Sequence, residues 1–342
     1  MTAAGTTDGQ PIEGPGQSGA GPASPPARGR IFSLEGRPGP GLYLVAWLFS
    51  VGGSALVLIG VQATPAARGL LVLIGLMSVG LGLASGCGYQ VLARASLPAV
   101  RYRGPSPILA FGLAAALGSA GGLVFGLLGL FDPDTPVGFL LGLLIVGAGY
   151  LVTVVFLVVR TGALAWSEMG WPVGPGRLAR AAREAAFGLA VTVPAVIPVL
   201  LLAALLASLI GVEPAGRIPS VATDPDALLV VVAAAFVAPL GEELFFRGFA
   251  LAAWQREIGP RRALVRGAIF FALVHVLNEG GTTFGEAAGQ ALLQFSVILP
   301  VGLVLGWVYQ RRGIAAAIAG HAGYNGALLL LALAVSRAVP GA

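Results

Sequence analysis

Five ionisable side chains lie inside stretches of sequence that are otherwise apolar enough to cross a membrane. They are Glu242, Glu243, Arg247, His275 and His321, and the two histidines are the only ones in the chain. Insertion scales assign about 2.5–3.5 kcal/mol to Asp, Lys or Arg at the centre of a span, so such residues are candidates for function by default. Carboxylates and imidazoles together suit general acid–base chemistry on water. The alternative is that these side chains only join helices.

The two adjacent glutamates are expected to differ in role. Glu243 and Arg247 are at positions i and i+4 of a helix, with the acid on the N-terminal side, which favours an ion pair on one helix face. We interpret this pair as mainly structural. Glu242 lies about 100° round the helix from Glu243 and has no arginine three or four residues later. Another helix or water must satisfy its carboxylate, which can therefore serve as a general base.

Each histidine has a companion one helical turn away. Phe271 precedes His275 in "FFALVH", and Asn325 follows His321 in "GHAGYN". A lone histidine in an apolar helix is more often a core residue than a catalytic one, and Asn325 can equally bridge helices. A histidine and an asparagine on one face, however, offer hydrogen-bond donors toward one point, which suits a developing oxyanion.

The spacing from the nearest arginines predicts one depth for these groups. Glu242 lies 14 residues before Arg256, and His275 and His321 each lie 9 residues after an arginine. At about 1.5 Å per residue these positions are roughly 14–21 Å from one end of their helices. The spacing therefore predicts that three helices line one polar cavity, which water reaches from that end.

Three motifs follow one another on successive apolar runs. They are EExxxR from Glu242 to Arg247, FxxxH from Phe271 to His275, and HxxxN from His321 to Asn325. Each is weak alone, but together and in this order they resemble the CPBP family. This is the CAAX-protease and bacteriocin-processing family, also called Abi, which is related to the type II CAAX prenyl endopeptidases. The resemblance covers about residues 225–336 and implies hydrolysis of peptide bonds within the membrane.

The resemblance also implies roles for the motif residues. Glu242 and His275 would activate a water molecule, and His321 and Asn325 would stabilise the oxyanion. Structural support would come from Glu243, Arg247 and Phe271. Members of the family are commonly called metalloproteases, and Glu242, His275 and His321 could hold Zn²⁺ with an open position for water. A glutamate-activated water needs no metal, and we favour that mechanism.

Composition indicates the elements that must position these residues. Of 342 residues, 56% are hydrophobic and 10% charged, and the mean hydropathy is +0.88. These values predict an all-α, polytopic transmembrane bundle in a lipid bilayer. The expected partners are this bilayer and a peptide or protein substrate, with no nucleic acid. The single cysteine, Cys87, excludes an intrachain disulfide and a cysteine metal site, and is expected to be a packing residue.

Apolar runs predict about nine spans, or eight if one is a surface helix. We expect them at 42–62, 69–93, 107–131, 137–160, 187–211, 226–255, 262–278, 287–310 and 313–336. The predicted regions are a disordered tail over 1–40, N-terminal spans over 41–161, an interfacial linker and amphipathic helix over 162–186, a fifth span and outer loop over 187–224, the catalytic region over 225–336 and a short tail over 337–342.

The arginines predict an orientation. Alternate loops hold sixteen arginines on one side and three on the other, and Arg247 lies within a span. By the positive-inside rule the N-terminus is cytoplasmic and the C-terminus lies outside. All basic residues are arginine in an Ala-, Gly- and Pro-rich chain, which is typical of a high-GC bacterium. The expected location is its plasma membrane.

Two other functions are compatible with buried ionisable groups. A proton-coupled transporter would use them as a relay, although no repeat of the EExxxR segment occurs in the first half of the chain. A non-catalytic immunity or scaffold protein could keep the fold without the reaction. Neither the natural substrate nor the oligomeric state follows from the sequence.

Overall fold

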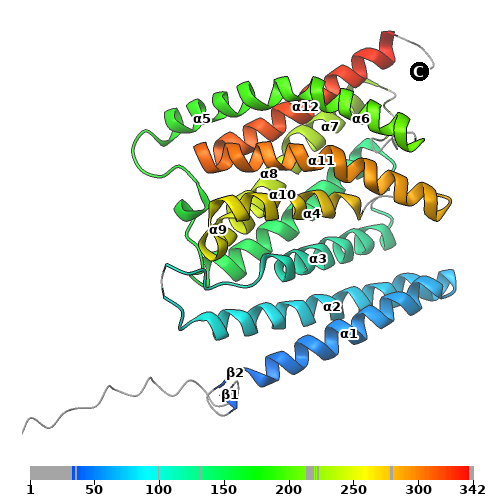
Figure 1. Ribbon diagram of the computed structural model, residues 1–342. Coiled ribbons are helices and arrows are strands. Elements are labelled where there is room, and N and C mark those ends of the chain that lie inside the picture. The colour runs from blue at the N-terminus through cyan, green and yellow to red at the C-terminus, as the bar shows by residue number, and fades with distance from the viewer. Residues whose placement is uncertain are drawn as a thin grey trace, which may run out of the picture.

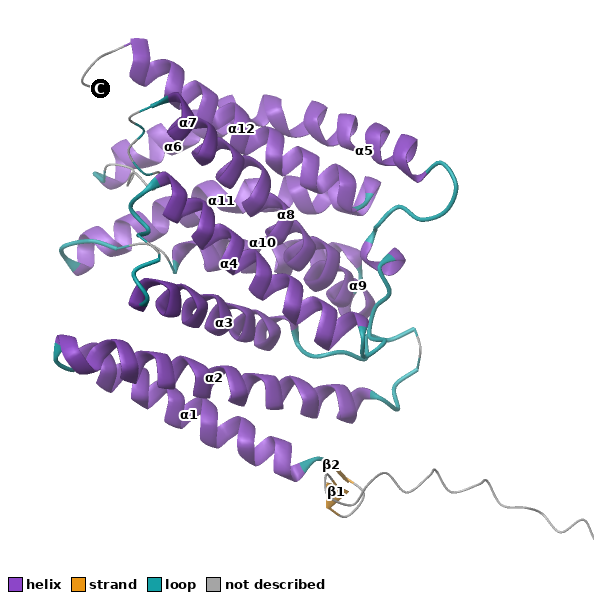
Figure 2. Ribbon diagram, turned by 180° about the vertical axis from the view of Figure 1, so that it is seen from behind, coloured by secondary structure: helices purple, strands orange, loops and turns teal. Residues whose placement is uncertain are grey.

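The computed structural model describes residues 33–34, 37–98, 100–130, 132–212, 219, 221, 223–277 and 280–338. Apart from one antiparallel ladder of two-residue strands, the elements are helical (Figures 1 and 2). In chain order they are β1 Ser33–Leu34, β2 Arg37–Pro38, α1 Pro40–Gln62, α2 Pro65–Arg94, α3 Pro107–Leu127, α4 Pro136–Val154, η2 Val155–Val159, η3 Ser167–Met169, α5 Arg177–Thr192, η4 Val193–Ala195, α6 Val196–Ile210, α7 Asp224–Val232, η5 Ala233–Val237, α8 Ala238–Glu243, η6 Leu244–Leu251, α9 Ala252–Ile258, α10 Pro260–Val276, α11 Phe284–Arg312 and α12 Ile314–Ala338.

Local sequence signals explain where many of these helices begin. Proline stands in the first turn of α1, α2, α3, α4 and α10, where its missing N–H costs no helical hydrogen bond. Thr223 and Asp226 form a reciprocal capping box at the start of α7. The turn from α9 to α10 uses Gly259 at a φ of 82°, a conformation that glycine adopts without strain.

Eight helical stretches in the described part of the chain are long and apolar enough to cross a membrane. The 17-residue α10 is slightly shorter, yet it runs through the same bundle (Figure 1). The prediction of an all-α bundle with about nine spans is therefore confirmed. The start of α1 and the end of α12 lie at opposite ends of the bundle in Figure 1.

The loops that carry most arginines meet at one end of the bundle, which we call the arginine end. Three ion pairs and one hydrogen bond join these loops. They are Arg94–Glu257 at 3.3 Å, Arg256–Glu168 at 2.5 Å, Arg312–Glu184 at 3.8 Å, and Gln310 Nε2 to the Pro260 carbonyl at 2.9 Å. Segments that the arginine count placed on one side of the membrane thus lie together at one end of the bundle.

The amphipathic segment before the fifth span differs from its prediction. Instead of a separate interfacial helix within 162–186, residues 177–210 form one helical stretch of 34 residues through α5, η4 and α6. At 1.5 Å per residue it is about 51 Å long, which exceeds a hydrocarbon layer of about 30 Å. Its first turns, with Arg177, Arg180 and Arg183, therefore extend beyond the apolar layer.

Aromatic side chains form the core of the C-terminal half. Phe245, Phe246 and Phe249 of η6 are buried against Tyr150 of α4 and Phe271 of α10. Most of the predicted tail, 1–40, and the residues after Ala338 lie outside the described residues. Cys87 is fully buried in the same core, as its packing role predicted.

Candidate active site

The two glutamates occupy a short α-helix between two π-helical segments. α8 ends at Glu243, η5 precedes it, and η6 continues it without a break for eight residues. A π-helical turn makes i→i+5 hydrogen bonds, is rare, and often occurs at functional sites. The widened turns change which faces of this span point inward, and every residue of η6 is buried. The hydropathy pattern did not predict these π-helical segments.

Glu243 is the fully buried centre of a charged cluster. Its Oε1 accepts a hydrogen bond from Arg247 Nη1 at 2.7 Å, as the i, i+4 spacing predicted. The same oxygen lies 2.8 Å from Nδ1 of His321, which comes from α12. The interpretation of Glu243 as a partner of Arg247 alone was therefore incomplete. Since a carboxylate paired with arginine can only accept, Nδ1 of His321 carries a proton.

His275 is oriented by its own helix. Its Nδ1 lies 2.7 Å from the carbonyl oxygen of Phe271, which can only accept a hydrogen bond. Nδ1 therefore carries a proton, and Nε2 of the neutral ring presents a lone pair. The spacing of Phe271 and His275 predicted that they share a face, and their ring centroids are 4.4 Å apart.

Both histidines direct Nε2 toward Glu242. The distance from Glu242 Oε2 is 3.9 Å to Nε2 of His275 and 3.9 Å to Nε2 of His321. These separations are too long for direct hydrogen bonds and short enough for one bridging water. The structure thus brings together Glu242, His275 and His321 from three helices at one depth, as the arginine spacing predicted.

Phe271 holds the cluster from the opposite side. The guanidinium carbon of Arg247 lies 4.0 Å from the centroid of its ring, a cation–π arrangement. The ring also makes an edge contact with His321 at 6.0 Å between centroids. One aromatic side chain therefore contacts the supporting arginine and both histidines.

Asn325 lies apart from this convergence. It is half-buried, and its Nδ2 donates to the carbonyl oxygen of Ala234 in η5 at 2.9 Å. This contact attaches α12 to the segment before the glutamates. The helix-bridging role that the sequence left open is thus present, and an oxyanion role remains a prediction.

The site has both an accessible side and a sealed side. The side chains of Glu242 and His275 each retain an exposed fraction of 21%, whereas Glu243 is inaccessible. On the sealed side, Glu243 Oε2 and Arg247 Nη2 are buried without a hydrogen-bond partner in the described part of the chain. The Glu242 carboxylate is therefore partly accessible, and the buried pair of Glu243 and Arg247 lies behind it.

The arrangement does not match a bound zinc ion. Ligand atoms at about 2.0–2.1 Å from tetrahedral Zn²⁺ are about 3.3–3.4 Å apart, and the Glu242–histidine separations are 3.9 Å. Among the described residues no group of three or more His, Cys, Asp or Glu side chains is placed to hold a metal ion.

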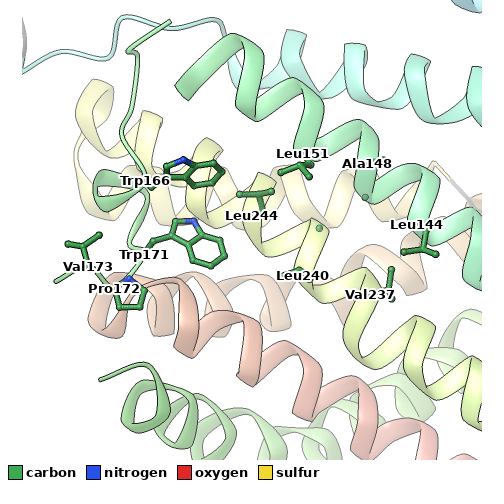
Figure 3. A pocket seen from close by; sticks show the side chains of 12 residues that line it. Leu144, Ala148, Leu151, Trp166, Trp171, Pro172, Val173, Val237, Leu240 and Leu244 are labelled. Carbon is green, nitrogen blue, oxygen red and sulfur yellow. The ribbon is translucent and has the colours of Figure 1, made fainter. Parts of the chain in front are cut away.

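An apolar cavity of about 690 Å³ adjoins the glutamate helix (Figure 3). Leu240, Gly241 and Leu244 form one wall, and Trp166 and Trp171 from the loop before α5 close one end. The remaining lining residues are Leu144, Gly147, Ala148, Leu151, Pro172, Val173 and Val237. Because Gly241 directly precedes Glu242, an apolar occupant would lie against the backbone next to this carboxylate.

Comparison with known families agrees with this geometry. Residues 224–327 match the model of the family described as type II CAAX prenyl endopeptidase Rce1-like. The region that contains both glutamates, both histidines and Asn325 is therefore a domain of the CAAX-protease class of membrane endopeptidases. Helices α1 to α6 lie outside this match, and the long apolar helices of the chain indicate an integral membrane protein. No curated protein and no solved structure matches the chain significantly.

Proposed function

We propose that this protein hydrolyses a peptide bond in the membrane with a water molecule activated by Glu242 and His275. The observation that carries the proposal is the position of Glu242 Oε2, 3.9 Å from Nε2 of each histidine. A water between these atoms can donate one hydrogen to the carboxylate and the other to an imidazole lone pair. Its oxygen then has a free lone pair for attack.

The reaction needs one proton acceptor and one returning proton. The water oxygen bonds to the scissile carbonyl carbon while its proton moves to Glu242, and the carbonyl oxygen becomes an oxyanion. Glu242 then gives this proton to the peptide nitrogen, and the C–N bond breaks. The products are a carboxylic acid and an amine, and Glu242 returns to its starting state.

His321 is the proposed oxyanion partner. Glu243 fixes its Nδ1–H, so Nε2 can donate to an oxyanion only when the ring carries a second proton. Asn325 would assist after its amide leaves the Ala234 carbonyl, 2.9 Å away in the resting structure. Glu243 thus acts as a positioning residue, because it orients a histidine and does not touch the reacting atoms.

The substrate is proposed to carry an apolar segment. The cavity beside Gly241 has two tryptophans at one end and aliphatic side chains along its walls, which suits large apolar groups. Filling it by Ala148→Phe would raise KM for an apolar peptide more than it lowers kcat, because Ala148 lines the cavity and not the charged cluster.

We assign the arginine end to the cytoplasm of a bacterial cell. Sixteen arginines against three satisfy the positive-inside rule in that orientation. Labelling of a single cysteine introduced near Arg311 in intact and opened cells tests this assignment, with Cys87 replaced by alanine. If an impermeant reagent labels this cysteine in intact cells, the arginine end faces the outside and the assignment is wrong.

The central experiment is peptide cleavage by the protein in lipid vesicles. Glu242→Gln keeps the shape of the side chain and removes the base, so kcat should fall by about 10²–10⁴-fold. Glu257→Gln is the matched control, because Glu257 pairs with Arg94 and lies outside the cluster. Equal rates for Glu242→Gln and wild type would exclude the proposal.

Two further measurements complete that experiment: cleavage in the presence of a chelator, and flux of substrate across the vesicle membrane. Activity that survives chelation agrees with the glutamate mechanism, whereas loss on chelation and return with Zn²⁺ would overturn the metal-free step. Substrate flux in the same vesicles without cleavage would favour the transporter alternative, and neither flux nor cleavage would favour the non-catalytic alternative.

A further inference from the structure

A second groove lies near the arginine end, apart from the charged cluster. Its volume is about 620 Å³, and α10 forms most of its wall. Ile108 of α3 and Trp254 of α9 form the other sides. The residues of α10 that line it are Arg261, Arg262, Val265, Arg266, Ile269, Phe270 and Leu273.

The mouth of this groove is positively charged. Arg261, Arg262 and Arg266 line it, and among the described residues no carboxylate lies within ion-pair distance of any of them. By contrast, Arg94, Arg256 and Arg312 at the same end each have a carboxylate partner. The guanidinium of Arg266 instead stacks over the ring of Trp254, with 4.6 Å from its carbon to the centroid. Three positive charges thus face one groove without an anion from the described chain.

The floor of the groove is apolar and follows the helix into the membrane. Val265, Ile269 and Leu273 recur at helical spacing and retain exposed fractions of 51%, 39% and 51%. From Arg262 to Leu273 the helix rises by about 16 Å, which is close to half of a hydrocarbon layer of about 30 Å. The groove therefore has a charged mouth at the interface and an apolar floor as deep as one leaflet.

We propose that this groove binds an anionic phospholipid of the leaflet at the arginine end. The phosphate of the lipid would lie among the three guanidinium groups, which bind phosphate through several N–H donors. One acyl chain would lie along Val265, Ile269 and Leu273. A free phosphate would leave this floor without a ligand, and a zwitterionic lipid would leave net positive charge in the mouth. The proposal does not depend on the peptidase reaction.

The test measures lipid retained by the purified full chain. After delipidation in neutral detergent, the protein is titrated with phosphatidylglycerol or phosphatidylcholine, and bound lipid is counted by native mass spectrometry. Each arginine near an anionic headgroup contributes about fivefold in affinity. Replacing all three by glutamine, as Arg261→Gln, Arg262→Gln and Arg266→Gln, should therefore weaken phosphatidylglycerol binding roughly a hundredfold.

A matched variant separates a built site from general charge. Arg177→Gln, Arg180→Gln and Arg183→Gln remove the same charge from exposed positions on α5 at the same end. This control should keep the tightly bound phosphatidylglycerol. If both triple variants lose bound phosphatidylglycerol equally, the groove is not a specific lipid site.

Two further arms test the lipid itself. Ile269→Trp fills the floor while it leaves every arginine in place, so it should weaken binding if an acyl chain lies there. Soluble glycerol phosphate should compete poorly with the intact lipid. Equal binding of phosphatidylcholine, or full competition by glycerol phosphate, would contradict the proposal. Circular dichroism of each variant establishes that the helices remain folded.

Discussion

The first two helices and the helices from α7 onward are held together by different kinds of packing. α1 and α2 approach each other through glycine, and their large side chains point outward. The later helices also have glycine contacts, but aromatic rings pack around their buried charges. The family match lies within the second region, at residues 224–327.

Glycine allows the backbones of α1 and α2 to touch. A Cβ atom added at Gly53 would lie 2.6 Å from the backbone nitrogen of Val79, and one added at Gly82 would lie 2.5 Å from that of Ser50. Small residues at such crossings are a general device of membrane helices, which gain little from hydrophobic burial in lipid. Leu44, Leu48 and Leu58 are correspondingly exposed.

The site region needs volume between its helices, and large side chains provide it. Phe245, Phe246 and Phe271 pack on one another between the helices, and Phe271 lies against the guanidinium of Arg247. Around Glu243 and Arg247 the aromatic side chains provide space for charged groups, and glycine brings a backbone close only next to them, where Gly241 faces Gly147. The predictions below test this difference.

The largest effect is expected where one member of the buried pair is removed. Arg247→Met keeps an apolar contact with Phe271 but leaves Glu243 as a buried charge whose remaining described hydrogen bond is to His321. Removing one partner of a buried ion pair costs about 3–5 kcal/mol. Unfolding of the purified protein by denaturant in detergent measures this loss.

The double variant Glu243→Gln with Arg247→Met is the control. Because it removes the uncompensated charge, it should be less destabilised than the sum of the two single variants. Additive losses would show that the two side chains contribute independently, and the aromatic region would then not depend on its enclosed charges.

The next effect concerns the glycine contact. Gly53→Leu forces a side chain into the backbone of α2 and should destabilise the protein by about 1–3 kcal/mol. Its neighbour Gly52 has no atom within 4 Å of an added Cβ, so Gly52→Leu should change stability by less than about 0.5 kcal/mol. The thermal midpoint of each variant in the same detergent measures the difference. Equal midpoints would contradict the role of glycine here.

The sequence predicted the spans well because hydropathy and length are sufficient for them. The predicted run 262–278 corresponds to α10 at Pro260–Val276, and 107–131 to α3 at Pro107–Leu127. The amphipathic residues expected before the fifth span form helix α5, which continues through η4 into α6 as one long stretch. Hydropathy marks where a helix enters the apolar layer and not where the helix begins.

The site was predictable within a helix and less so between helices. The spacing of Glu243 and Arg247 identified their ion pair, but Glu243 and His321 are 78 positions apart in the sequence, so their direct contact could not be predicted from spacing. Periodicity gives the face of a residue, whereas the rotation of one helix against another depends on packing. For the same reason, Asn325 shares a helix with His321 yet directs its amide to Ala234.

The smallest expected effect lies outside the membrane, where the loop between α4 and α5 meets the second of these regions. Glu168, in the loop between α4 and α5, accepts a hydrogen bond from the Ala165 N–H at 2.6 Å and pairs with Arg256 of α9. These contacts, the backbone hydrogen bond first, lower the pKa of Glu168 below its ordinary 4.5. A carboxyl group with a lowered pKa stabilises the fold above its ordinary pKa, and this contribution is lost as pH falls through the lowered value.

Because the side chain of Glu168 is 40% exposed, solvent screens the pair, and Glu168→Gln should cost less than about 1 kcal/mol at pH 7. The difference in thermal midpoint between wild type and this variant should shrink below about pH 4.5. A difference that stayed constant down to pH 3 would show that the charge of Glu168 does not link the loop to α9.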